Sequence, residues 1–309
     1  MWVIIMFEYT LDNKRYHTFN YFLKKKFNKK VFKVPIDAHF SCPNKKTGGC
    51  IFCTDGSKSN ITDNNKNILE QFEEVKAIML KKWPDSLYIP YFQANTNTYA
   101  SLEKLKELYE PLLEKENVVG LAIATRPDSI TDEVFEYLKD LNNRTFLMVE
   151  LGLQSSFDKT LEFINRGHDV KCFENMVKKL KKNNIFVVAH IINGLPGETK
   201  EMMINTAKYL NSLNIDAIKI HMLHVVKDTR LTELYKEEPF HILSKEEYID
   251  IVCEQLTYLN KRIVIERITG DPIKENLIEP NWLIKKFVLL NDIDKEMKKR
   301  NIYQGINAK

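Results

Sequence analysis

The sequence predicts an α/β protein, a partial (β/α)6 barrel of the TIM type with a small C-terminal α/β extension. Apolar, β-branched runs alternate with amphipathic helical patterns through the middle of the 309-residue chain, which is typical of parallel strands joined by helices. The run 118–124 is apolar at nearly every position, as expected of a strand covered on both faces. Polar or glycine-rich stretches follow the runs, where a parallel barrel carries its active site.

Six strands and five helices are expected in this core. The strands are predicted at 31–37, 86–93, 118–125, 146–154, 185–192 and 217–223. The helices are predicted at 69–83, 102–115, 132–141, 173–182 and 201–213. In the third helix Val134, Leu138 and Leu141 share one face, the spacing of a helix packed on a sheet. Such long connections are what neighbouring parallel strands require.

The pattern changes after about residue 235. Ser244 and Glu247 form a capping box that begins a helix ending near residue 259. A short strand at 263–267 and a helix at 282–300 follow. We therefore expect three parts, namely a basic N-terminal leader (1–30), the core barrel (31–235) and an extension packed on the barrel (236–309).

The charge of the chain is nearly balanced, with 46 basic and 42 acidic side chains and a net charge of +4. One segment is strongly basic, and its lysines are Lys24, Lys25, Lys26, Lys29, Lys30 and Lys33. Phenylalanines are interleaved with them, so the segment fits either a solvated face or a nucleic-acid patch. No apolar run approaches the roughly 20 residues of a membrane span, and the apolar stretch 2–7 is too short for a signal peptide. We expect a soluble, cytoplasmic protein without a membrane partner.

The five cysteines point to metal rather than to disulfides. Three of them, Cys42, Cys50 and Cys53, lie within twelve residues directly after the first predicted strand. Three thiolates on one loop can bind three irons of a 4Fe-4S cluster and leave the fourth iron for an outside ligand. Spacing alone leaves a zinc knuckle open, with His39 as the fourth ligand. The position after the first strand of a βα repeat favours an active-site cluster.

The three cysteines resemble the signature of the radical S-adenosylmethionine (SAM) superfamily, in the branch of the Elongator catalytic subunit and oxygen-independent coproporphyrinogen oxidase. The resemblance implies a 4Fe-4S cluster on the three cysteines and SAM as the second cofactor. Three later stretches resemble motifs of that branch: Glu150–Ser155 in the second half of the fourth strand, Asn165-Arg166-Gly167-His168, and Asn193–Thr199 after the fifth strand. The match covers roughly residues 15–235 in the family's order.

The resemblance also assigns cofactor contacts. Phe52 stands where the family has an aromatic residue near the adenine of SAM, and Glu150 and Gln154 match side chains that reach its ribose and methionine parts. The remaining candidates for SAM contacts are Arg166, Gly194 and Leu195. One departure concerns the second strand, where the family has a Gly-Gly-Glu-type turn for the SAM ammonium group. In this chain Asn95 and Thr96 stand in that region.

A narrower resemblance concerns the substrate. Tyr91–Thr98, together with Arg15-Tyr16 and Arg267–Asp271, looks like the short bacterial radical SAM proteins that lack the Elongator acetyltransferase domain. That resemblance implies a tRNA substrate, with 5-carboxymethylaminomethyluridine at the wobble position converted toward 5-aminomethyluridine. It also implies an electron donor such as flavodoxin or ferredoxin, and a separate methyltransferase acting afterwards.

The candidate substrate residues are Arg126, His168, His221, Lys24, Lys25 and Lys26. Arg126 has an alternative role in a structural ion pair with Asp128, and His190 is expected to be a satisfied buried histidine. Three rival functions stay open. They are a radical SAM enzyme acting on a small metabolite, a zinc-stabilised RNA-binding module, and a methylthiolation enzyme, although the last usually has a second cysteine trio that this chain lacks.

Overall fold

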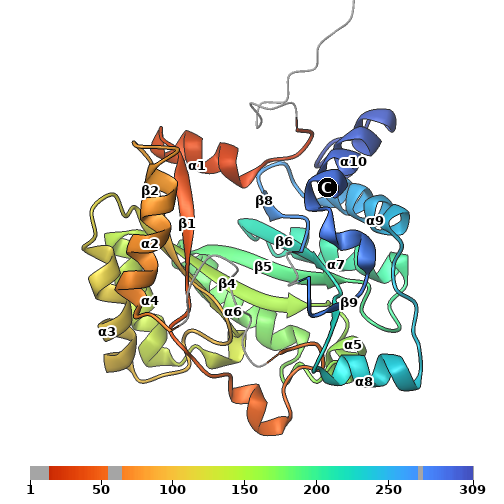
Figure 1. Cartoon of the computed structure of the whole chain (residues 1–309), viewed down its shortest axis with the longest axis horizontal. Helices are drawn as coiled ribbons and strands as arrows, with labels where there is room; N and C mark the ends of the chain where they lie inside the picture. The colour runs from red at the N-terminus through yellow and green to blue at the C-terminus, as the bar shows by residue number, and fades with distance from the viewer. Residues whose placement is uncertain (1–13, 55–64, 271–273, 309) are drawn as a thin grey trace, which may run out of the picture.

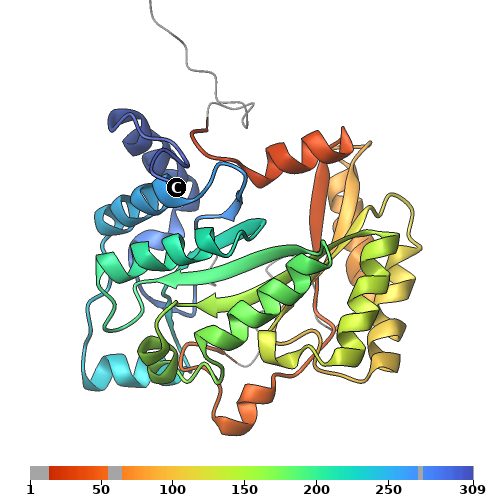
Figure 2. The ribbon, with the colours of Figure 1, turned by 180° about the vertical axis from the view of Figure 1, so that it is seen from behind.

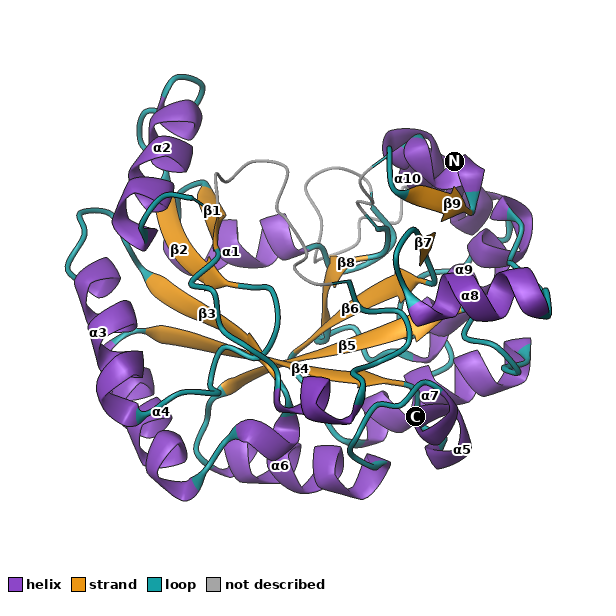
Figure 3. Cartoon of the chain, turned by 60° about the horizontal axis from the view of Figure 1, so that its bottom comes forward, coloured by secondary structure: helices purple, strands orange, loops and turns teal. Residues whose placement is uncertain are grey.

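The computed structural model describes residues 14–54, 65–270 and 274–308. Its centre is a parallel sheet of seven strands that curves into a half-barrel (Figure 1, Figure 3). In spatial order the strands are β1 (Val31–Ile36), β2 (Leu87–Phe92), β3 (Gly120–Thr125), β4 (Phe146–Gln154), β5 (Phe186–Asn193), β6 (Ala217–Met222) and β8 (Val264–Arg267). The predicted partial barrel is therefore confirmed.

The seventh strand comes from the C-terminal extension. Sequence reasoning found a short strand there but did not place it in the main sheet. β8 pairs in parallel with β6, through Ala217 opposite Val264 and Ile218 opposite Ile265. Without this pairing the edge of β6 would leave its backbone groups unpaired, so the extension completes the sheet as well as packing on it.

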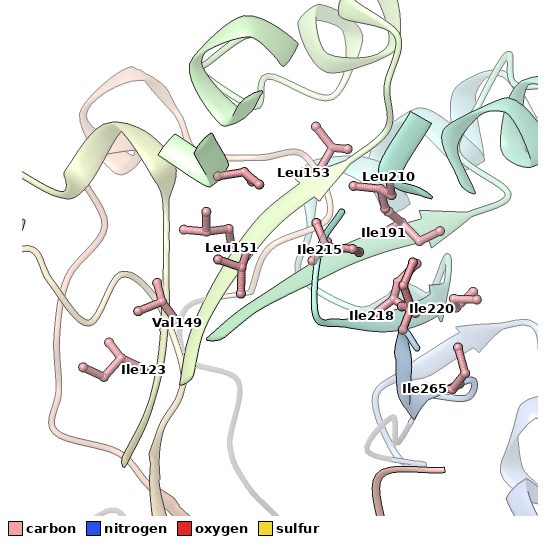
Figure 4. Packing of buried hydrophobic residues seen from close by; sticks show 14 of the residues in the cluster. Ile123, Val149, Leu151, Leu153, Ile191, Leu210, Ile215, Ile218, Ile220 and Ile265 are labelled. Carbon is pink, nitrogen blue, oxygen red and sulfur yellow. The ribbon is translucent and has the colours of Figure 1, made fainter. Parts of the chain in front are cut away.

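Helices cover the outer, convex face of the sheet (Figure 2, Figure 3). They are α2 (Ile68–Leu80), α3 (Leu102–Leu113), α4 (Asp132–Arg144), α6 (Val170–Lys182), α7 (Lys200–Ser212) and α9 (Lys245–Tyr258). The main core lies between these helices and the outward-facing strand residues, among them Val149, Leu151 and Ile191 (Figure 4). The capping box predicted at Ser244 is present at the start of α9.

The predicted basic leader contains a helix that sequence reasoning missed. α1 (Phe19–Phe27) lies across the amino ends of the strands, where Leu23 packs against Val31, Met148 and Val264. Its N-cap, Thr18, forms a parallel bridge to Ile265 of β8. One end of the half-barrel is thus covered by α1, and the cysteine loop occupies the other end (Figure 1).

The remaining elements lie mainly at the carboxyl ends of the strands and on the C-terminal side. They are α5 (Asp158–Phe163), α8 (Arg230–Glu237), a two-stranded antiparallel sheet of β7 (Val225–Val226) and β9 (Leu277–Glu279), and α10 (Lys286–Lys299). The helix predicted at 282–300 is shorter, because a 3-10 turn, Asn281–Ile284, precedes α10. No helix within the described ranges has the length and apolar character needed to cross a membrane.

Candidate active site

The cysteine loop leaves the carboxyl end of β1. Cys42 caps a short 3-10 helix (Pro43–Thr47), and Gly48 and Gly49 then reverse the chain with φ values of 90° and 71°. Residues with side chains rarely adopt such values, so the two glycines allow the sharp turn predicted before Cys50. The amide of Cys53 donates to the carbonyl oxygen of Cys50 at 3.0 Å, which folds the last two thiols toward one side of the loop.

A segment more than 110 residues away in the sequence holds this loop in place. The Asn165 side chain donates to the carbonyl oxygens of Thr47 (2.9 Å) and Gly49 (2.7 Å). In return, the buried Asn44 side chain donates to the carbonyl oxygen of Asn165 at 2.7 Å. These contacts give a structural reason for the motif Asn165-Arg166-Gly167-His168: its first residue holds the loop that carries the three cysteines.

Two donors approach the sulfur of Cys50. Asn44 Nδ2 lies 3.5 Å and Arg166 Nη1 lies 3.8 Å from Cys50 Sγ. The hydrogen bond with Cys53, and then the charge of Arg166, lower the pKa of the Cys50 thiol to about 5. A thiolate is the form that binds iron, so this thiol is prepared for metal at neutral pH. Arg166 is itself fixed by a 2.6 Å hydrogen bond to the carbonyl oxygen of Gly152.

The residues present fit a cluster with a bound polar ligand. Arg166 Nε, Thr96 Oγ1 and His168 Nε2 are buried and make no hydrogen bond within the described chain. Buried polar atoms of this kind normally have a partner, and a bound cofactor would supply one. Among the residues that the structure describes, no three His, Cys, Asp or Glu side chains converge to hold a single metal ion. A cubane cluster needs no such convergence, because each thiolate binds a different iron.

The other residues predicted to contact SAM fall around this loop. Phe52 and Leu195 belong to one apolar cluster together with Ile51, which connects the loop to the end of β5. Thr96 donates its amide to the carbonyl oxygen of Ser41, directly before Cys42, at 3.2 Å, whereas Asn95 is exposed. Gln154 is the last residue of β4 and Gly194 directly follows β5, with φ values of 78° and 86°. Their contacts with SAM stay predictions.

Arg126 forms the ion pair that was its alternative role. Its Nε and Nη2 atoms donate to the two carboxylate oxygens of Asp128 at 2.9 and 2.7 Å, and its Nη1 donates to the carbonyl oxygen of Arg166 at 2.8 Å. Arg126 therefore supports the segment that holds the cysteine loop. Next to it, burial and the charge of Arg166 lower the pKa of His168 to about 4. The substrate roles of Arg126 and His168 stay predictions.

A buried layer of charge fills the inside of the half-barrel below the cysteine loop. Glu150 accepts from Lys33, from Lys219 at 2.5 Å and from His190 at 2.7 Å. Glu266 pairs with the same two lysines at 2.6 and 3.2 Å. Although burial disfavours the charged form, Lys219 and Lys33 hold the pKa of Glu150 well below its ordinary range. Glu150 thus has charged partners within the chain, and its contact with the ribose of SAM stays a prediction.

This charged layer corrects the assignment of Lys33 to the basic surface segment, and it adds two residues, Lys219 and Glu266, that the sequence analysis did not single out. Lys33 is not part of the surface segment with which its spacing grouped it, because it points into the barrel. His190 is hydrogen-bonded to Glu150, as expected of a satisfied histidine, but it is half-buried rather than buried. The ring centroids of His190 and His221 lie 5.4 Å apart. Sequence reasoning missed Lys219 and Glu266, although a charge inside an apolar strand such as 217–222 indicates a buried partner.

The predicted substrate lysines are not near the cysteine loop. Lys24, Lys25 and Lys26 form the exposed last turn of α1, at the amino ends of the strands. Any role in substrate binding must therefore concern a part of the substrate remote from the reacting atoms. His39 is also exposed; its amide donates to Asp37 Oδ1 at 2.9 Å, and its Nδ1 lies 4.0 Å from the same oxygen.

Residues 41–210 match the Radical SAM superfamily, and residues 215–299 match the Radical_SAM C-terminal domain. The chain belongs to the radical SAM superfamily. This membership implies SAM and a 4Fe-4S cluster as cofactors, as the cysteine loop had indicated.

Relatives narrow this placement. The chain is 44% identical over 304 residues to the uncharacterized protein YtqA of Bacillus subtilis, covering 97% of this chain and 94% of YtqA. It is 28% identical to the tRNA uridine(34) acetyltransferase of Methanocaldococcus infernus, over 57% of this chain and 33% of that enzyme. The solved structure of the archaeal M. infernus Elp3 has a TM-score of 0.69 at 20% identity, covering 89% of this chain and 64% of that one. The Elongator-like resemblance is therefore confirmed at the level of family and fold.

Proposed function

We propose that this radical SAM enzyme modifies the side chain of a wobble uridine in tRNA, converting 5-carboxymethylaminomethyluridine toward 5-aminomethyluridine. The observation that carries the proposal is the similarity to a tRNA uridine(34) acetyltransferase across 57% of this chain. The chain is similar to only 33% of that enzyme, so the shared part is a region and not the whole activity. A small electron-transfer protein such as flavodoxin or ferredoxin would supply electrons, and a separate methyltransferase would use the product.

The bound cofactors would supply a 5′-deoxyadenosyl radical, which removes a hydrogen atom from the substrate. The carbon between the nitrogen and the carboxylate of the carboxymethyl group is a suitable donor, since both neighbours stabilise the radical left behind. Loss of one electron from this radical to the electron carrier and of one proton from the nitrogen would give an imine. Water would then hydrolyse the imine, breaking its C–N bond, to release glyoxylate and leave the 5-aminomethyl group. The protein's own part is to fix the geometry and exclude water. Arg166, Asn44 and Asn165 position the cysteine loop, while the charged layer and α1 close the barrel beneath it.

Arg126 could bind the substrate carboxylate only by exchanging its present partner. Its Nε and Nη2 donors are occupied by the Asp128 carboxylate in a bidentate pair, and its Nη1 by the carbonyl oxygen of Arg166. A substrate carboxylate has the same shape and charge, so it can replace Asp128 without leaving the guanidinium unpaired. An Asp128→Asn variant would weaken the competing pair and should lower the KM for such a substrate while leaving SAM cleavage intact.

The test begins with anaerobic purification, analysis of iron and sulfide, and incubation with SAM and a reductant. We expect close to four irons per chain and formation of 5′-deoxyadenosine, both lost in Cys50→Ala. Incubation with tRNA carrying 5-carboxymethylaminomethyluridine, followed by nucleoside mass spectrometry, should then show 5-aminomethyluridine. Formation of 5′-deoxyadenosine with unchanged tRNA would favour an enzyme of small metabolites. Stoichiometric zinc and intact SAM would favour a zinc-stabilised binding module.

A further inference from the structure

The amino ends of the strands carry two adjoining hollows beside α1. One, of about 470 Å³, is lined by Lys25, Lys26 and Arg262 together with aromatic residues of α1. The other, of about 1050 Å³, is lined by Lys26 and Lys182 and extends over the ends of α4 and α6. Lys26 belongs to both, so the two hollows form a continuous basic surface.

Four cations define this surface, which we call the basic end surface: Lys25, Lys26, Lys182 and Arg262. They come from three separate parts of the chain, namely α1, the end of α6 and the segment before β8. All four are exposed, and none forms an ion pair with another described residue. Neighbouring cations differ in this respect, since Lys181 pairs with Asp216 at 2.5 Å.

The aromatic residues interleaved with the lysines have a different role. Phe22 packs against Phe186 with ring centroids 5.2 Å apart, and Lys26 Nζ lies 4.5 Å from the ring centre of Phe146. The apolar side of α1 is therefore turned to the barrel, and its lysines are turned outward. Lysines in the last turn also suit the dipole of α1, and Lys182 suits that of α6 in the same way. The helix dipoles do not explain why the two helix ends and Arg262, which belongs to no helix, meet on one surface.

A group of exposed cations without carboxylate partners is the electrostatic pattern of a phosphate-backbone contact. We propose that the basic end surface binds the RNA backbone and holds a part of tRNA remote from the reacting base. β4 spans nine residues, or about 30 Å at the usual rise per residue, which separates this surface from the cysteine loop. The identity of the RNA as tRNA rests on the proposed function; the phosphate contact rests on the surface itself.

The experiment compares the iron-loaded wild type with a Lys25→Ala/Lys26→Ala/Lys182→Ala variant. Binding of a tRNA transcript with a wobble uridine is measured at several salt concentrations. Each phosphate contact that is lost should reduce the slope of log affinity against log salt by about one, so we expect a slope flatter by two to three. Formation of 5′-deoxyadenosine without RNA should be unchanged, since these residues lie at the other end of the barrel.

The matched control removes three lysines from the outer helices, in a Lys104→Ala/Lys106→Ala/Lys178→Ala variant. These residues are exposed on α3 and α6, and the change in net charge is the same. The control should keep the slope of the wild type. Equal slopes for both triple variants, or binding to anionic vesicles without binding to tRNA, would overturn the proposal.

The two proposals fail in different ways. A flatter salt slope in the triple variant, without any change in wobble nucleosides on incubation with the wild type, would support the basic end surface and refute the proposed function. Nucleoside conversion together with an unaltered slope in the Lys25→Ala/Lys26→Ala/Lys182→Ala variant would support the proposed function and refute the basic end surface. A Cys50→Ala protein should bind tRNA as the wild type does, because the surface does not depend on the cluster.

Discussion

The two ends of the half-barrel are built on different principles. At the carboxyl ends of the strands, the cysteine loop is held by directional hydrogen bonds, from Asn165 and Arg166 to the loop and from Asn44 of the loop to Asn165. At the amino ends, α1 seals the barrel with apolar side chains and presents unpaired lysines to solvent. Directional contacts fix the positions of single groups, whereas exposed charges add up to a surface potential that salt screens. Substitutions at the first end should therefore depend sharply on position, and those at the second on total charge.

The largest effect is expected in the charged layer between the two ends. A Glu150→Ala variant leaves Lys33 and Lys219 with only Glu266 as a buried carboxylate partner. Removing one member of a buried ion pair typically costs about 3–5 kcal/mol of unfolding free energy. Denaturant unfolding of the cluster-free protein measures this loss.

The control is Glu107→Ala, which breaks an exposed pair with Lys104 on α3 and should cost less than about 1 kcal/mol. Similar losses in the two variants would mean that the charged layer contributes no more than a surface pair. The two ends would then not be separated by a structural layer of the kind described.

A pair of glycines sharpens the contrast at the carboxyl end. Gly167 and Gly197 are both exposed, with φ values of 79° and 80°. A Cβ at Gly167 would lie 2.1 Å from Asn44 Oδ1, whereas one at Gly197 would meet nothing within 4 Å. Both alanine variants should lose about 1–2 kcal/mol for the strained backbone. Gly167→Ala should lose roughly 1–3 kcal/mol more through crowding.

Gly167→Ala should also retain less iron after reconstitution, because displaced Asn44 no longer supports Cys50. Iron analysis and denaturant unfolding of both variants check this. Equal iron content and equal stability would show that the packing of Asn44 does not position the cysteine loop.

The last effect is confined to acidic pH and concerns His168. The folded protein holds the pKa of His168 at about 4 by burial and by the charge of Arg166, while an unfolded histidine titrates near 6.5. Between these values the unfolded chain binds a proton that the folded chain does not. The contribution of His168 to the free energy of unfolding is therefore fully present above about pH 6.5. It falls as the pH drops toward 4, by up to about 1.4 kcal/mol per pH unit.

A His168→Gln variant should show a shallower fall over this window when unfolding of the cluster-free protein is followed at several pH values. His39→Gln, at an exposed position, should keep the profile of the wild type. Parallel profiles for all three proteins would refute the contribution of His168.

Strands were predictable because burial on both faces leaves continuous apolar runs, and β4 matches its predicted range of 146–154. The cysteine loop was predictable because its ligands are adjacent in sequence. α1 was missed because its lysines hid an apolar stripe of Phe19, Phe22, Leu23 and Phe27. The pairing of Lys33 with Glu150 depends on how strands 117 residues apart are placed across the barrel, which local patterns do not contain.

The contact between α1 and β8 has a consequence for the order of events during synthesis. The carbonyl oxygen of His17 accepts from the amide of Ile265, so the first described helix is anchored to a strand made about 250 residues later. At typical ribosomal rates of 5–20 residues per second, roughly 12–50 s pass between the two. Throughout that interval α1 lacks its contacts with β8, so Leu23 cannot yet pack against Val264. During synthesis, therefore, the cationic segment of α1 carries apolar side chains that are not yet fully buried, and their burial is completed only when β8 joins the sheet.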